Sequence, residues 1–72
     1  MQTNDLIKIQ IELPEEVAFQ LAQFIKRQGY TDCFQVTEYH LKEDLREQRA
    51  YAMLAGLDAI KSALAREGVS PR

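Results

Sequence analysis

Cysteine, histidine and tryptophan are scarce in this sequence of 72 residues. It contains one cysteine, Cys33, one histidine, His40, and no tryptophan. A single cysteine has no partner for an intramolecular disulfide, and His40 has no second His or Cys at zinc-ligand spacing. We therefore expect no disulfide, no metal and no other cofactor, and we expect Cys33 to be a small buried apolar residue.

Long hydrophobic runs and an excess of basic residues are also missing. No apolar run approaches the roughly 18 to 20 residues of a membrane span, and we expect no signal peptide because the first residues do not have the pattern of one. Acidic residues outnumber basic ones by 11 to 9, for a net charge of −2. We expect a cytoplasmic protein without membrane contact, and any contact with nucleic acid to be local.

Motifs of known enzymes are absent as well. The sequence has no glycine-rich phosphate loop, no nucleophile elbow and no Cys/His arrangement. Glu15 and Glu16 are adjacent, so their side chains point in different directions, which is unsuitable for an acid and a base acting on one bond. A chain this small cannot enclose a pocket alone. We predict no enzymatic activity and no catalytic residues.

The clearest pattern in the chain is an alternation of apolar and polar residues over 6–13. Apolar residues occupy every second position, namely Ile7, Ile9, Ile11 and Leu13, and the polar residues between them are Lys8, Gln10 and Glu12. This period of two predicts a β-strand with one apolar face, preceded by a flexible arm over 1–5. Pro14 ends the strand, and the acidic pair after it suits a helix start.

No second strand of comparable quality follows, and a single strand leaves its backbone groups without partners. We therefore predict that the strand pairs with its copy across a homodimer. The expected fold class is α+β, mostly α, with one N-terminal strand followed by two or three helices. A single domain of this length rarely gains more than roughly 3–5 kcal/mol from its own core, which also favours association.

Helical periodicity covers most of the remaining chain. We predict helices over 14–28, 33–48 and 49–67, followed by a tail over 68–72, all within one domain. Whether 33–67 forms one helix or two stays open. Two helices are favoured, because a straight helix of that length would exceed the usual globular range.

Glycines and turn residues mark the predicted helix ends. Gly29 and Gly68 are expected to be left-handed caps of the helices that precede them. Thr31 or Asp32 is expected to cap the second helix by accepting a hydrogen bond from a free backbone N–H.

Two residues are candidate contacts for a partner. Phe19 falls off the apolar stripe of its helix, so it is either covered within the dimer or offered to another protein. Gly56 belongs to a row of small residues with Ala52, Ala59 and Ala63. This row predicts a close approach of another helix, nearest at Gly56.

The strand and the following LPEEVAFQLAQFIKRQGYT resemble the opening of ribbon-helix-helix proteins, which are dimeric repressors and antitoxins. The resemblance implies that Lys8, Gln10 and Glu12 face the DNA major groove and that the backbone over 31–33 contacts phosphate. Glu12 departs from the family, which commonly has a basic residue there. Phosphates repel a carboxylate, although Glu can accept a hydrogen bond from cytosine N4.

A second resemblance spans more of the chain. The segments LAQFIKRQGYTDCF, AYAML and AIKSALAREGVSPR resemble a family of small uncharacterised bacterial and phage-associated proteins, and only the long charged segment over 36–48 departs from it. This resemblance implies an origin in a bacterium or its mobile DNA. We therefore expect a protein that acts by binding a bacterial protein, for example as an inhibitor of a host complex. The alternative is a ribbon-helix-helix type antitoxin or transcriptional repressor that binds DNA, which the acidic balance and Glu12 disfavour.

Overall fold

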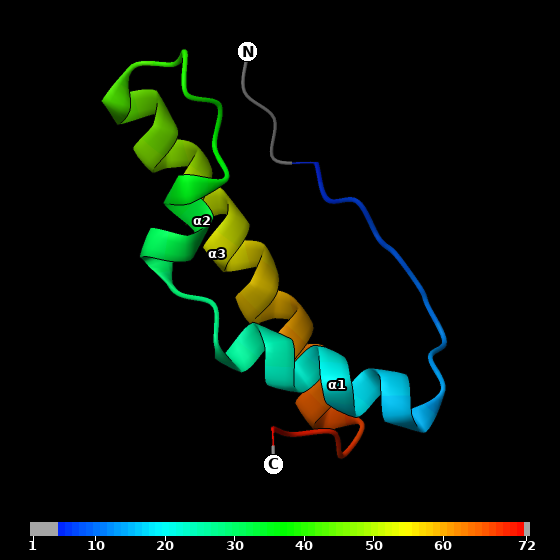
Figure 1. The fold of residues 1–72 in the computed structure, drawn as a ribbon. Helices are drawn as coiled ribbons and strands as arrows, with labels where there is room; N and C mark the ends of the chain where they lie inside the picture. Colours follow the sequence, from blue (N-terminus) through cyan, green and yellow to red (C-terminus); the bar gives the residue numbers. More distant parts are fainter. Residues whose placement is uncertain (1–4, 72) are drawn as a thin grey trace.

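The computed structural model describes residues 5–71 and contains three α-helices. They are α1 (Glu15–Lys26), α2 (Tyr30–Gln35) and α3 (Glu43–Arg66), and both shorter helices lie against α3 (Figure 1). None of residues 5–71 forms a β-strand, so the protein is all-α and the α+β fold class expected from the sequence is wrong. Residues 1–4 of the arm predicted over 1–5, and residue 72 of the predicted tail, lie outside the described residues.

The 6–13 segment is extended and unpaired. It leaves the start of α1 and runs back along the molecule apart from the helices (Figure 1). Its backbone makes no hydrogen bond to another residue of the 5–71 range, and Ile7 is 89% exposed. The alternating pattern correctly indicated an extended backbone. A strand also needs a neighbouring strand, and none of the residues that follow provides one.

The first helix begins and ends where charge and backbone geometry favour it. Pro14 precedes α1, Glu15 and Glu16 occupy the first turn, and Lys26 occupies the last. These charges complement the helix dipole. Gly29 has a φ of −122° and is therefore not the left-handed cap predicted from the sequence. It precedes α2, where its N–H donates a 2.8 Å hydrogen bond to Asp32.

The break in the second half of the chain lies over residues 36–42. The helices predicted over 33–48 and 49–67 are replaced by the short α2 and the long α3. Thr37 explains the position, because its hydroxyl donates a 2.6 Å hydrogen bond to the carbonyl of Phe34 and so competes with helix continuation. Val36 and Thr37 are also β-branched and disfavour helix.

The end of α3 follows the prediction. Gly68 has a φ of +84°, and its N–H donates to the carbonyl of Ala65. The N–H of Val69 donates to the carbonyl of Leu64 at 2.9 Å. This pair of bonds is a Schellman motif, which requires the left-handed conformation that glycine adopts without strain.

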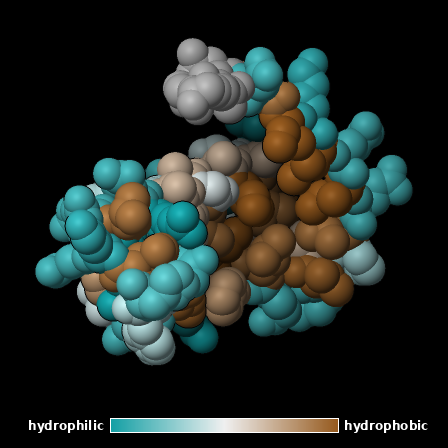
Figure 2. Space-filling model, turned by 90° about the horizontal axis from the view of Figure 1, so that it is seen from above, coloured by the Kyte–Doolittle hydropathy of each residue, from teal (hydrophilic) through white to brown (hydrophobic). Residues whose placement is uncertain are grey.

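The core is small. Its buried apolar residues are Ala18, Ala22, Ile25, Cys33 and Ala50, and Thr37 is buried with them. Most larger apolar side chains stay partly or fully exposed, and many of them gather on one face between the helices and the 6–13 segment (Figure 2). Among the described residues, no helix is both long and apolar enough to cross a bilayer.

Candidate functional site

An unbroken series of ring contacts links α2, α3 and the connection between them. The rings of Tyr51 and Tyr30 lie 4.9 Å apart, and those of Tyr30 and Phe34 lie 5.9 Å apart. The guanidinium of Arg46 lies 4.3 Å from the ring centre of Phe34 and 5.0 Å from that of Tyr39. We call these five residues the tyrosine–arginine surface. It contains all three tyrosines of the chain.

Local sequence explains part of this arrangement. Tyr30 and Phe34 are four residues apart on α2, so their rings share one face of the helix. Arg46 and Tyr51 come from α3, and Tyr39 comes from the connection over 36–42. Tyr39 is 80% exposed and Tyr51 is 59% exposed, so the surface presents aromatic rings to solvent.

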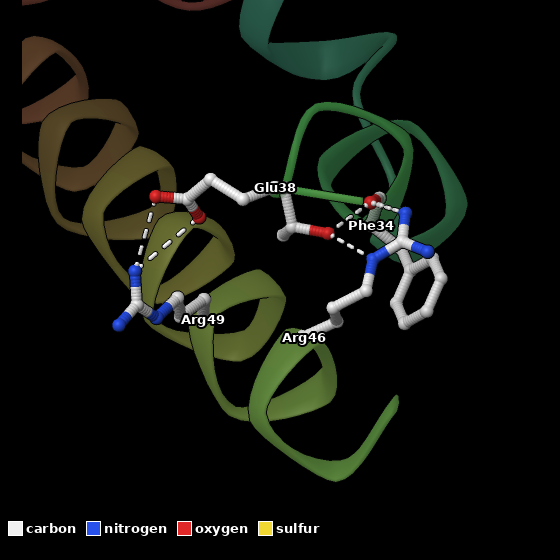
Figure 3. Close-up of polar contacts among 5 residues, drawn as sticks. Phe34, Glu38, Arg46 and Arg49 are labelled. Carbon is white, nitrogen blue, oxygen red and sulfur yellow. Dashed lines mark hydrogen bonds and ion pairs between the residues drawn. The ribbon is translucent and has the colours of Figure 1, made fainter. Parts of the chain in front are cut away.

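Arg46 holds the connection against α3. Its Nε donates a 2.7 Å hydrogen bond to Thr37 Oγ1, and a terminal nitrogen donates a 3.2 Å bond to the carbonyl of Phe34 (Figure 3). Thr37 is buried, and its own hydroxyl donates to the same carbonyl. One arginine therefore satisfies polar groups of α2 and of the connection while stacking on two rings.

A second arginine of α3 reaches the same connection. Arg49 Nη1 lies 3.2 Å and 3.3 Å from the two carboxylate oxygens of Glu38 (Figure 3). The pKa of Glu38 is lowered, mainly because its carboxylate accepts a hydrogen bond from its own backbone N–H, with a smaller contribution from the charge of Arg49. Both side chains are about half exposed, so this pair orients the connection more than it stabilises the fold.

Tyr30 keeps its proton across the neutral range. Partial burial raises its pKa above the ordinary value, and the nearby carboxylate of Glu47 raises it further. The phenol therefore offers a neutral O–H group for hydrogen bonding.

A separate apolar trough lies beside α1 and α3. One hollow of about 540 Å³ is bounded by the end of the 6–13 segment, α1 and the C-terminal part of α3. A second hollow of about 440 Å³ lies between Phe24 of α1, Val36 after α2, and Met53 and Leu57 of α3. Ile60 lines both hollows, which together we call the trough.

The residues singled out as partner contacts lie on this trough. Phe19 lines the first hollow, half-buried, and Gly56 lines the second. Apart from the adjoining backbone of α3 itself, a Cβ on Gly56 would meet no heavy atom within 4 Å. The row of small residues is exposed along its whole length, so no helix within residues 5–71 makes the close approach predicted there.

The residues singled out as DNA contacts lie elsewhere. Lys8, Gln10 and Glu12 are exposed on the extended 6–13 segment. The paired ribbon that would carry them into a major groove is not formed within residues 5–71. The structure therefore does not arrange these side chains to contact DNA bases.

The described residues offer little for metal or buried polar chemistry. Within residues 5–71, no group of three or more His, Cys, Asp and Glu side chains is arranged to hold a metal ion. Every buried side-chain nitrogen or oxygen in that range has a hydrogen-bond partner.

Sequence reasoning missed the tyrosine–arginine surface. The spacing of Tyr30 and Phe34 was a usable signal, because residues four apart on a helix share a face. The contacts with Arg46 and Tyr51 could not be predicted from the sequence, since they depend on how α2 folds back onto α3.

Comparison with known proteins identifies a matching family. A family model described as a family of unknown function (DUF7706) matches residues 1–72. No curated protein and no solved structure matches the chain.

Proposed function

The chain belongs to the DUF7706 family of unknown function, and we propose that it acts without catalysis, by binding another protein through the tyrosine–arginine surface. The single observation that carries this proposal is the exposed series of rings joined through Arg46. Tyr and Arg, together with Trp, are enriched among the residues that dominate binding energy at protein interfaces. A bacterial protein, as expected from the sequence, remains the proposed partner.

The rigidity of the surface supports the proposal. Arg46 is held by two hydrogen bonds and two rings, and Arg49 with Glu38 orients the connection on its other side. Side chains that are already ordered lose less conformational entropy on binding. Tyr39 and Tyr51 can therefore contribute large contact areas at a low entropic cost.

The charges around the surface favour a protein over a nucleic acid. Glu43, Asp44 and Glu47 lie in the first turns of α3, next to Arg46. These carboxylates repel phosphate groups. Two of the nitrogens that Arg46 would offer to a phosphate already bond to Thr37 and Phe34. DNA binding through Lys8, Gln10 and Glu12 stays an untested prediction that no geometry here favours.

The test is affinity capture with the full chain as bait in bacterial extract, followed by titration of the purified partner. We expect Tyr39→Ser and Tyr51→Ser each to weaken the partner's affinity at least tenfold, as for interface residues that dominate binding. Lys61→Ala, which shortens an exposed side chain elsewhere on α3, is the control and should leave the affinity unchanged.

Two results would contradict the proposal. One is a captured partner whose affinity is the same for both tyrosine variants and the wild type. The other is salt-sensitive binding to promoter DNA that Lys8→Ala weakens and the tyrosine variants do not. That result would support a DNA-binding antitoxin or repressor instead.

A further inference from the structure

The chain is too open to be a self-contained domain. Its Cα radius of gyration is 14.2 Å, whereas a compact domain of this length has about 11 Å. Its accessible surface is 6105 Å², and a folded monomer of 8.3 kDa exposes roughly 4,600 Å². The single chain thus exposes roughly 1,500 Å² more than expected for its mass.

Large apolar side chains are exposed on the 6–13 segment and on α1, the elements beside the trough. The isoleucines of the 6–13 segment are each more than 60% exposed, and Phe24 of α1 is 56% exposed. Figure 2 shows apolar atoms on the face between this segment and the helices. Exposed apolar patches on monomers are usually a few hundred Å² at most, so a face of this kind needs a cover.

We propose that a second copy of this chain fills the trough, so that the protein is a homodimer whose core forms between the two copies. In a twofold arrangement, the α1 and α3 face around the trough of one copy packs against the same face of the other copy. The apolar face of each 6–13 segment then packs on helices of the partner copy. This interface is separate from the tyrosine–arginine surface.

The area identifies a second copy as the occupant. Obligate homodimers bury about 1,000–2,500 Å² on each partner, and the excess of the single chain falls in that range. Only one large apolar residue, Ile25, is among the buried residues, so the fold depends on the cover. A partner required for folding has to be present whenever the chain is made. Another copy of the chain meets this condition, because it is made at the same time.

The lining of the second hollow suits burial in a dimer. Asp32 is the one ionisable carboxylate there, and it already accepts the N–H of Gly29. The space beside Gly56 is empty, which leaves room for a neighbouring helix to approach the backbone of α3. The carboxylates of Glu12, Glu15 and Glu67 line the first hollow but are exposed, at its rim.

Sedimentation equilibrium and thermal melts of the full chain test the proposal. We expect a mass of twice 8.3 kDa at about 10 µM, and a melting temperature that rises with protein concentration. A stably folded 8.3 kDa species with a concentration-independent melt would overturn the proposal. So would a monomer whose trough is occupied by a different protein.

A pair of α3 variants locates the interface. Ile60→Glu places a carboxylate where the two hollows meet, and we expect it to raise the dimer dissociation constant at least a hundredfold. Ala55→Glu places the same carboxylate on the opposite, exposed side of α3 and should leave the constant unchanged. Equal dissociation constants for the two variants would contradict the assignment of the trough.

Gly56→Leu is a second test of the interface, for the case that Ile60→Glu fails to fold. In a single chain the new side chain enters open space, and leucine favours helix more than glycine does. We expect it to raise the dimer dissociation constant at least tenfold. A dimer as tight as the wild type would place Gly56 in solvent and refute the packing. Tyr39→Ser should not affect dimer mass, so loss of partner binding and loss of the dimer remain separate results.

Discussion

Arg46 is the residue on which the short connection between α2 and α3 depends. It donates to Thr37 and to the carbonyl of Phe34 and stacks on the ring of Phe34. We expect Arg46→Ala to lower the free energy of unfolding by about 1.5–3 kcal/mol, the usual range for hydrogen bonds to a charged group. Thermal melts at one protein concentration measure it. The control Arg66→Ala, in the last turn of α3, should lower the free energy of unfolding by no more than about 1 kcal/mol. Equal losses for the two variants would mean that the contacts of Arg46 do not stabilise the fold.

Glu38 should make stability depend on pH in the acid range. Its pKa is lower in the folded state than in the unfolded chain, so the unfolded state binds protons first as pH falls. The stabilisation is complete above the ordinary carboxyl pKa and is lost as pH falls through the lowered folded-state pKa. We expect the melting temperatures of wild type and Glu38→Gln to differ at pH 7 and to converge in acid.

Arg49 provides the check on that assignment. Because the backbone hydrogen bond is the larger cause of the shift, Arg49→Gln should reduce the pH dependence without removing it. A Glu38→Gln variant that differs from wild type by the same amount at every pH would contradict the lowered pKa.

At the scale of elements, alanine substitutions of the two loop glycines should have different effects on stability. Gly68 sits at φ +84°, where a side chain is strained, so Gly68→Ala should destabilise α3 by about 1 kcal/mol. Gly29 has an ordinary φ of −122°, and an added Cβ would lie 3.8 Å from Asp32 Oδ2, a normal contact. Gly29→Ala should be neutral or stabilise by up to about 1 kcal/mol. Chemical denaturation of both variants decides whether the Schellman motif sets the end of α3.

Hydrogen exchange tests the correction to the 6–13 segment. Its backbone N–H groups lack partners among residues 5–71, so they should exchange at nearly unprotected rates, whereas amides in the middle of α3 should be protected. Alternate protection along 6–13 would reveal a paired strand and contradict the all-α description.

At the scale of the whole molecule, net charge and exposed apolar surface act together. The sequence pI is about 5.3, so mutual repulsion is weakest near that pH. We expect turbidity of a concentrated solution to peak near pH 5.3 and to clear at pH 8, where the net charge is negative. Turbidity that is independent of pH would show that the apolar faces are already covered more completely than a dimer covers them.

The sequence by itself determined the local features of this protein. Alternation made 6–13 extended, helical periodicity and Pro14 placed α1, and Gly68 ended α3, because each depends on neighbouring residues alone. Tertiary structure decided the rest. Whether an extended segment becomes a strand depends on a partner, and the packing of the 36–42 connection on α3 depends on Arg46 reaching back to Thr37. The tyrosine–arginine surface and the trough exist only where separate helices meet, and no local pattern encodes that meeting.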